Sequence, residues 1–333
     1  MARAAFVMER LMRCVGLPGK AFVPMLSAHA CAIPGIMSAR VIENWRDRLT
    51  TILVLPLLTC SARIPVYAMI AALLFSQSAI KAALVFVGCY LLGITAALCS
   101  AWLLKKTVLP GEAVPLVIEL PQLRTPSLRN ALLIMADRAL IFTRQAGTVI
   151  MLISVMLWIL ASYPKLPESE VALIEQQATS VNNSPENQIA QQAIEYSIAG
   201  RVGRFVEPVF APLGFDWQIN IGVMTSFAAR EVVVSTLAIV FGIGEDAAED
   251  KTTLIETLRR QKRPDGSPVF TTATSLSFLV FFVLAMQCLP TQAVTRRETG
   301  SWKWAILQFT FMSCLAYVAS LVTYQVCYLA GLG

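Results

Sequence analysis

The chain has 333 residues, of which 56% are hydrophobic and only 14% are charged. Because a soluble domain has about a quarter charged residues, this composition argues against one, and it excludes a disordered chain. Several stretches of about 18 or more residues are almost wholly apolar, which is typical of membrane-spanning helices. The net charge of +6 indicates cationic loops on the cytoplasmic side of a membrane, since no basic run with interleaved aromatic residues points to nucleic acid. We therefore predict an all-α, polytopic helical membrane protein.

The N-terminal part contains an amphipathic segment, an interrupted apolar segment and two spans. Residues 1–19 have the spacing of an amphipathic helix at the membrane interface. Residues 20–104 form a first gate region with its following span. Its apolar stretch Ala21–Ala39 contains prolines, which is typical of a re-entrant or broken helix that packs on protein. A charged link leads to the expected spans Leu49–Phe75 and Ala79–Leu104.

The rest of the chain divides into six segments. They are a cytoplasmic connection (105–145), a span (146–163), an external polar loop (164–204), a second gate region (205–243), a polar loop (244–271) and a two-span hairpin (272–333). Lys and Arg concentrate in the connections assigned to the cytoplasm. Further spans bring the expected total to about six: Ala146–Tyr163, Trp217–Phe241, Thr272–Leu289 and Trp302–Tyr328.

Two of the apolar stretches share an unusual interruption. One reads Thr59-Cys60-Ser61-Ala62-Arg63 and the other Thr225-Ser226-Phe227-Ala228-Ala229-Arg230, each followed by an apolar run. Matched breaks in two halves of a chain point to a transporter site built from an internal repeat. A charge at the bilayer centre costs about 2.5 kcal/mol or more, so Glu231 and the two arginines need partners or water. Chance similarity of two short motifs is the alternative.

The acid Glu231 is the strongest single candidate for a cation-binding group, and an ion pair with Arg63 is its structural alternative. Cys31 and Cys60 lie in broken segments, where thiolate sulfur would accept ferrous iron; packing of small residues is the alternative. His29 offers either a nitrogen ligand or a bond to a backbone carbonyl.

The charged link predicts a structural feature rather than a site. Glu43 and Asp47 are four residues apart among three arginines, which indicates a salt-bridged cap at the membrane surface. Motifs for nucleotide binding, serine hydrolysis and zinc proteolysis are absent, so we predict no enzyme, no catalytic residue and no nucleotide-binding residue.

At this point the motifs resemble a known family, the ferrous iron transport protein B family. His29–Ala68 is similar to its first gate, with a Cys-x-x-Pro-(Ala/Gly) turn at Cys31–Gly35, a charged link at Glu43–Arg48 and a Cys-Ser-Ala-Arg-x-Pro-Val-Tyr segment at Cys60–Tyr67. Thr225–Gly242 is similar to its second gate, although Ala228 stands where the family has proline. The resemblance covers nearly the whole chain.

The resemblance implies import of Fe²⁺, as the transported substrate, across the bacterial inner membrane by a multi-pass permease. The family joins its membrane region to an N-terminal GTP-binding domain. That domain is absent here and the match begins in mid-pattern, so we expect a truncated chain. The implied partners are membrane lipid, a GTPase domain or subunit and small Feo-type accessory proteins; a homo-oligomer is compatible, and nucleic acid is not expected.

The expected ion-pathway residues are Cys31, Cys60, Ser61 and Glu231, followed in rank by His29, Thr59, Ser226 and Cys288. The expected structural gate residues are Pro34, Gly35, Arg63, Pro65 and Arg230. Two alternatives stay open. One is a permease with similar gate repeats for another solute, such as a nucleoside. The other is an inactive remnant or assembly subunit that needs a separate GTPase.

Overall fold

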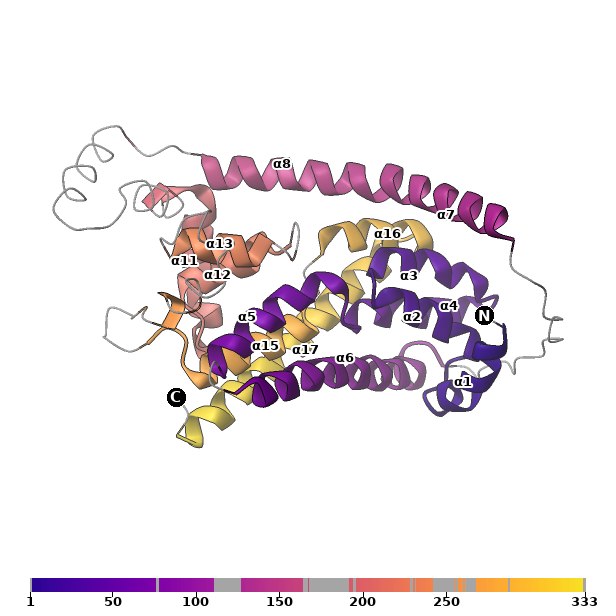
Figure 1. Cartoon of the computed structure of the whole chain (residues 1–333), viewed down its shortest axis with the longest axis horizontal. Coiled ribbons are helices and arrows are strands. Elements are labelled where there is room, and N and C mark those ends of the chain that lie inside the picture. Colours follow the sequence, from indigo (N-terminus) through magenta and orange to yellow (C-terminus); the bar gives the residue numbers. More distant parts are fainter. Residues whose placement is uncertain are drawn as a thin grey trace. The chain divides into compact units, whose positions relative to one another are not determined.

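A computed structural model describes residues 2–75, 78–110, 127–163, 167, 192–193, 196–227, 230, 232–241, 255, 257–259, 261, 268–286 and 288–331. Within these residues every regular element is a helix, so the all-α prediction is confirmed (Figure 1). Contacts divide the chain into two compact units.

Unit 1 comprises Met1–Ser61, Tyr90–Leu152 and Leu289–Met312. Its elements begin with α1 (Ala2–Cys14), η1 (Gly19–Ala21), α2 (Phe22–Ala28), α3 (Ala32–Ser38), η2 (Ala39–Val41), α4 (Trp45–Val54) and η3 (Leu55–Leu57). The later part of α6 (Ala79–Thr107), α7 (Leu128–Phe142), a π turn (Thr143–Gly147), the start of α8 (Thr148–Ser162), α16 (Leu289–Thr299) and the start of α17 (Trp302–Leu329) complete it.

Unit 2 comprises Ala62–Cys89, Ile153–Cys288 and Ser313–Gly333. Its elements are the end of η4 (Ser61–Arg63), α5 (Ile64–Leu74), the start of α6, the end of α8, α11 (Ile198–Phe210), η6 (Ala211–Leu213), α12 (Trp217–Thr225), α13 (Val232–Val240), α15 (Thr272–Leu284) and the end of α17. Edge-to-face rings form part of its core: Phe215 has centroid distances of 5.8 Å to Phe278 and 5.7 Å to Phe281.

Four helical stretches of the described chain are long and apolar enough to cross a membrane: Trp45–Leu74, Ala79–Thr107, Thr272–Thr299 and Trp302–Leu329. They overlap four of the expected spans, although Trp45–Leu74 and Thr272–Thr299 each contain a break in the helix. The other two are shorter, because α8 has 15 residues and the stretch from Trp217 is divided into α12 and α13, with 9 residues each. The polytopic membrane architecture therefore agrees with the sequence.

Prolines mark the helix starts that follow the predicted breaks. Pro34 lies in the first turn of α3, and Pro65 lies in the first turn of α5. The N–H groups of a first helical turn have no intrahelical partner, so proline is tolerated there although it has none. Gly35 adds a second constraint, because a Cβ atom there would lie 3.0 Å from Cβ of Ala28 on α2. Glycine thus allows α3 to pack closely against α2.

The sequence did not predict a third break. The expected span Thr272–Leu289 ends early, because α15 stops at Leu284 and α16 starts at Leu289 with Pro290 in its first turn. Helix α16 also contains Arg296 and Arg297, which were expected in a turn between spans. The same physical cause, a proline with no N–H to donate, accounts for this break.

Candidate functional site: a hydrogen-bonded pair of helix breaks

Two interruptions in unit 1 face each other: residues 29–31, between α2 and α3, and residues 58–60, after η3. We call them the break pair. The Nδ1 atom of His29 lies 3.0 Å from the carbonyl oxygen of Thr59. Because a carbonyl oxygen only accepts, Nδ1 carries the proton and the lone pair of a neutral His29 is on Nε2. The bond therefore joins the two breaks and fixes the tautomer of the histidine.

A second contact joins the same breaks one or two residues further along. The carbonyl oxygen of Ala30 accepts from the N–H of Ser61 at 3.4 Å and from the Ser61 hydroxyl at 2.8 Å. Ala30 precedes Cys31 and Ser61 follows Cys60, so these bonds hold the two cysteine-bearing turns next to each other. Cys31 is half-buried, and Cys60 is 8% exposed.

Helix α6 closes one side of the break pair. The ring of Tyr90 stacks on His29 with a centroid distance of 6.2 Å and an interplanar angle of 16°. One turn later, a Cβ atom on Gly93 would lie 3.0 Å from Oγ1 of Thr59 and 3.2 Å from the carbonyl oxygen of Leu57. Glycine is needed for so close an approach of helix and break.

Pro56 creates a backbone acceptor that a distant side chain satisfies. It has no N–H to donate to the carbonyl of Ile52, four residues earlier in α4. The buried amide of Gln308 on α17 donates instead, at 2.9 Å to the Ile52 oxygen and 3.1 Å to the Leu53 oxygen. The Gln308 carbonyl in turn accepts from the Thr295 hydroxyl at 2.9 Å. The helix end before the break is thus covered by protein.

The break pair brings together five of the predicted site residues: His29, Cys31, Thr59, Cys60 and Ser61. In the described part of the chain, no group of three or more His, Cys, Asp or Glu side chains is placed to hold a metal ion. Thiols, an imidazole and hydroxyls are a mixed set of soft and hard donors, which suits a borderline divalent cation.

The second gate region lies at the end of α12 and in α13, in unit 2. Ser226 is fully buried and its hydroxyl donates to the carbonyl of Val223, while Arg230 is 6% exposed. Glu231 lies outside the described residues. Its predicted role as an ion-pathway carboxylate, and its alternative as a partner of Arg63, therefore stay predictions.

Arg63 stabilises the third break. Its side chain is fully buried in unit 2, and its Nη2 donates to the carbonyl oxygen of Ala285 at 3.2 Å. Ala285 follows the last residue of α15 and has an extended backbone, so it begins the interruption before α16. Cys288 lies in the same interruption and is half-buried.

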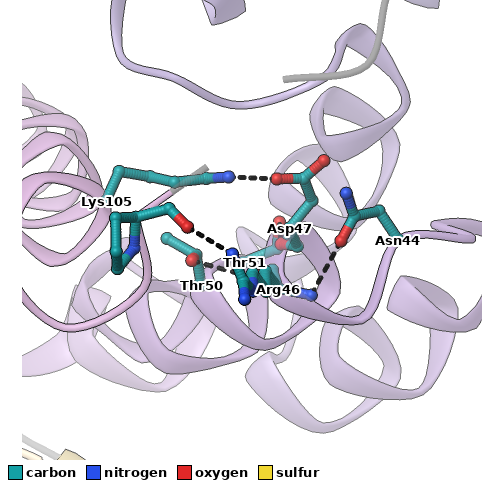
Figure 2. A network of polar contacts seen from close by, with 7 residues as sticks. Asn44, Arg46, Asp47, Thr50, Thr51 and Lys105 are labelled. Carbon is teal, nitrogen blue, oxygen red and sulfur yellow. Dashed lines mark hydrogen bonds and ion pairs between the residues drawn. The ribbon is translucent and has the colours of Figure 1, made fainter. Parts of the chain in front are cut away.

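The charged link does not form the expected salt-bridged surface cap. The Asp47 carboxylate accepts from Nζ of Lys105, and the two side chains are 1% and 6% exposed (Figure 2). Asn44 starts α4 by accepting from the N–H of Arg46 at 3.0 Å, and Arg46 reaches out to the Pro110 carbonyl at 2.7 Å. The prediction was wrong for Asp47 because a lysine from α6 meets it out of water.

The other acid of the link, Glu43, also pairs outside it. Its Oε1 atom lies 2.8 Å from Nζ of Lys20, and this hydrogen bond lowers the pKa of Glu43. Arg40 donates twice to Glu298 of α16, at 2.8 and 2.5 Å, and this hydrogen bonding raises the pKa of Arg40. The link is therefore tied to three other segments of unit 1.

Comparison with known proteins now identifies the family. A family model described as "Nucleoside recognition" matches residues 1–74 and 143–302, and one described as "Ferrous iron transport protein B C terminus" matches residues 86–138. The chain belongs to the ferrous iron transport protein B family. Both gate regions lie within the first of these matches, so the family resemblance read from the motifs is confirmed.

Relatives named as Fe(2+) transporters of this family align along nearly the whole chain. "Fe(2+) transporter FeoB" of Leptospira interrogans (strain 56601) is 42% identical and that of Leptospira biflexa 43%; each alignment covers 98% of this chain but only 46% and 45% of the relative. An "Fe(2+) transport protein A/Fe(2+) transporter FeoB fusion protein" of Porphyromonas gingivalis is 37% identical over 98% of this chain and 40% of its own length. The chain thus spans about half the length of these relatives. No solved structure matched it.

Two buried polar residues of this family member escaped the sequence reasoning. Asn220 on α12 is 2% exposed, and Ser275 on α15 is fully buried. Within the described residues, neither side-chain polar atom of Asn220 has a hydrogen-bond partner, nor has Oγ of Ser275. An unsatisfied buried polar group of this kind costs about 1–3 kcal/mol of stability. The amide of Asn220 between two isoleucines was the available signal.

Proposed function

We propose that this chain forms the membrane pathway for Fe²⁺ entry into the bacterial cytoplasm, across the inner membrane. The names of the relatives, at 37–43% identity over 98% of the chain, support iron as the substrate. The observation that carries the local mechanism is the hydrogen-bonded break pair, which collects thiol, imidazole and hydroxyl groups from two distant segments.

In this proposal the break pair exchanges part of the hydration shell of Fe²⁺ for protein ligands. Cys31 and Cys60 supply sulfur, and the hydroxyls of Thr59 and Ser61 supply oxygen. Iron(II) is a borderline cation that accepts both donor types. Because the Thr59 and Ala30 carbonyls are already hydrogen-bonded, the side chains carry more of the ligation than the backbone does. Glu231 of the second gate region is proposed as a separate carboxylate of the ion pathway.

The proposal includes a GTP-binding domain or subunit that controls the gate. The relatives are about twice as long as this chain, which leaves room for such a part in them. The fusion in Porphyromonas gingivalis supports a small accessory protein, transport protein A, as a further partner. The chain itself would supply the pathway and would catalyse no reaction.

The test is uptake of radioactive ferrous iron, under reducing conditions, by cells that lack their own ferrous importer. Cells would express the chain with and without a family GTP-binding domain. Cys60→Ala and Cys31→Ala are each expected to lower uptake at least tenfold, about 1.4 kcal/mol of lost transition-state stabilisation. Cys99→Ala is the matched control, because Cys99 is an exposed cysteine on α6 away from the break pair.

Membrane-inserted protein would be quantified for each variant, so that lost uptake is separated from lost protein. Full uptake in both gate-cysteine variants would contradict their role. No saturable iron uptake by the wild-type chain, with or without the GTP-binding domain, would contradict the function itself.

One observation favours a second candidate. The family model that covers both gate regions is described as "Nucleoside recognition", which keeps a nucleoside permease open. Competition separates the two: excess Mn²⁺ is expected to inhibit iron uptake, whereas excess nucleoside is expected to leave it unchanged. Labelled nucleoside uptake that depends on this chain would favour the second candidate.

A further inference from the structure

An apolar groove opens on unit 1 between the end of α6 and the start of α17. It has a volume of about 710 Å³, within the range of small-ligand sites. Its apolar lining comes from both helices: Leu103, Leu104 and Val108 of α6, and Ile306, Leu307 and Phe311 of α17. Leu104 is 4% exposed and forms the floor, while Ile306 is 60% exposed at the rim. The groove therefore combines buried and exposed apolar side chains and is open on one side.

Aromatic and basic residues of the kind found at a membrane interface lie next to the groove in the sequence of both helices. Trp102 on α6 is 50% exposed and Trp302 on α17 is 52% exposed. A cation covers each ring: Nζ of Lys106 lies 5.1 Å from the Trp102 centroid, and Cζ of Arg296 lies 4.4 Å from the Trp302 centroid. Tryptophan with Lys or Arg at a helix end is typical of the membrane interface, where the lipid head groups lie.

The charge at this end is positive. Lys303 is the charged residue of the groove lining. Among the described residues, the nearby acids Asp47 and Glu298 are already paired with Lys105 and Arg40. In that same part of the chain Lys106, Arg296, Arg297 and Lys303 form no ion pair, so the charge of Lys303 at the groove is not neutralised by an acid.

We propose that this groove binds an anionic phospholipid, with one acyl chain along the apolar lining and the phosphate at the Lys303 ammonium. Charge complementarity selects this occupant over a neutral lipid, because a basic cluster near the membrane surface attracts anionic head groups. The proposal requires that the chain is inserted in a membrane and does not depend on which solute it transports.

The experiment is native mass spectrometry of the purified full chain in detergent, titrated with phosphatidylglycerol or phosphatidylcholine of identical acyl chains. The wild type is expected to bind one phosphatidylglycerol about fivefold more tightly than phosphatidylcholine, the factor that corresponds to about 1 kcal/mol for one basic residue near the surface. Lys303→Gln is expected to abolish the preference. Ile306→Trp fills the groove from its open side and is expected to weaken binding of both lipids.

Lys81→Gln is the matched control, since Lys81 is an exposed lysine at the other end of α6. It is expected to keep the wild-type preference. Equal affinity for the two lipids would overturn the proposal, and so would a preference that survives Lys303→Gln or is lost equally in Lys81→Gln. Absence of a saturable lipid adduct would also overturn it, and would indicate that protein covers the groove.

Discussion

Buried polar groups form hydrogen bonds at the break pair of unit 1, whereas a buried amide on helix α12 of unit 2 has no partner among the described residues. At the break pair, side chains from distant segments satisfy the groups that the interrupted backbone leaves open, as His29, Ser61 and Gln308 do. On α12, Asn220 is buried with both side-chain polar atoms unpartnered within the described residues. The polar groups at the break pair are thus satisfied by protein, whereas the described residues supply no hydrogen bond to the Asn220 side chain.

The largest expected effect comes from the buried ion pair that anchors α4 to α6 in unit 1. Asp47→Asn leaves the Lys105 ammonium buried without its counter-charge and is expected to cost about 3–5 kcal/mol of unfolding free energy. Denaturant titration in detergent micelles measures it. The double variant Asp47→Asn/Lys105→Met removes both charges and is expected to recover most of the loss. A single variant that costs no more than an exposed pair, about 0.5 kcal/mol, would contradict the buried pair.

Replacing Gln308 with leucine tests the hydrogen bonds that satisfy the end of α4 before the break. The change removes the donors to the Ile52 and Leu53 carbonyls and leaves them buried, which is expected to lower the unfolding free energy by about 1–3 kcal/mol. The same titration checks it. Gln308→Glu keeps the shape but loses the N–H donors, so it is expected to be at least as destabilising; wild-type stability in either variant would remove Gln308 from this role.

The same kind of change at Asn220 is expected to have the opposite sign. Asn220→Leu removes a buried amide that has no hydrogen-bond partner among the described residues, so the unfolding free energy should be unchanged or rise by about 1 kcal/mol. Destabilisation as large as that of Gln308→Leu would show that the Asn220 side chain forms hydrogen bonds, and would contradict the difference between the break pair and α12.

A smaller effect is expected where α6 approaches the break pair. Gly93→Ala places a Cβ atom 3.0 Å from Oγ1 of Thr59, which is expected to cost about 1–2 kcal/mol by overpacking. Gly88→Ala is the matched control on the same helix, since a Cβ atom there meets nothing within 4 Å. Its higher helix propensity should leave melting temperature equal or slightly raised. Equal behaviour of the two variants would argue against close contact at Gly93.

The smallest expected effect is that of pH on the exposed pair of Lys20 and Glu43. The pKa of Glu43 is lowered from 4.5 by its bond to Lys20. A lowered carboxyl pKa means that the pair stabilises the fold above pH 4.5 and that this contribution is lost as the pH falls through the lowered value. Because Glu43 is exposed, the melting temperatures of wild type and Glu43→Gln should differ only slightly at pH 7 and converge at low pH. A widening difference would contradict the sign.

The sequence was sufficient for the helices and for the breaks that prolines mark. Pro34 and Pro65 sit in first helical turns because local chemistry decides this, and local chemistry is visible in a sequence. Pro290 carried the same signal, yet the apolar run around it concealed the third break. The family motifs placed Cys31 and Cys60 at breaks, but not the bonds that join those breaks.

Hydrogen-bond and ion-pair partners that are far apart in the sequence could not be predicted. Asp47 has three arginines close to it in the sequence, so a local salt bridge was expected. It pairs with Lys105 instead, because α6 packs against α4 there and both side chains are buried. Gln308 looked like one polar residue in an apolar span. Its hydrogen bonds to the Ile52 and Leu53 carbonyls are needed because of Pro56, which is far away in the sequence. A single sequence does not show which distant residues contact each other.

Gln308 and Pro56 are expected to change together in evolution, because the Gln308 amide donates to a carbonyl that the Pro56 ring leaves without a backbone donor. Gln308 lies 256 positions from the Ile52 carbonyl that Pro56 leaves without a donor. A descendant that exchanged Pro56 for an ordinary residue would regain the backbone donor, and position 308 would be released to become apolar. Divergence in this family should therefore change the two positions together, and a chimaera that takes them from different parents should be less stable than either parent.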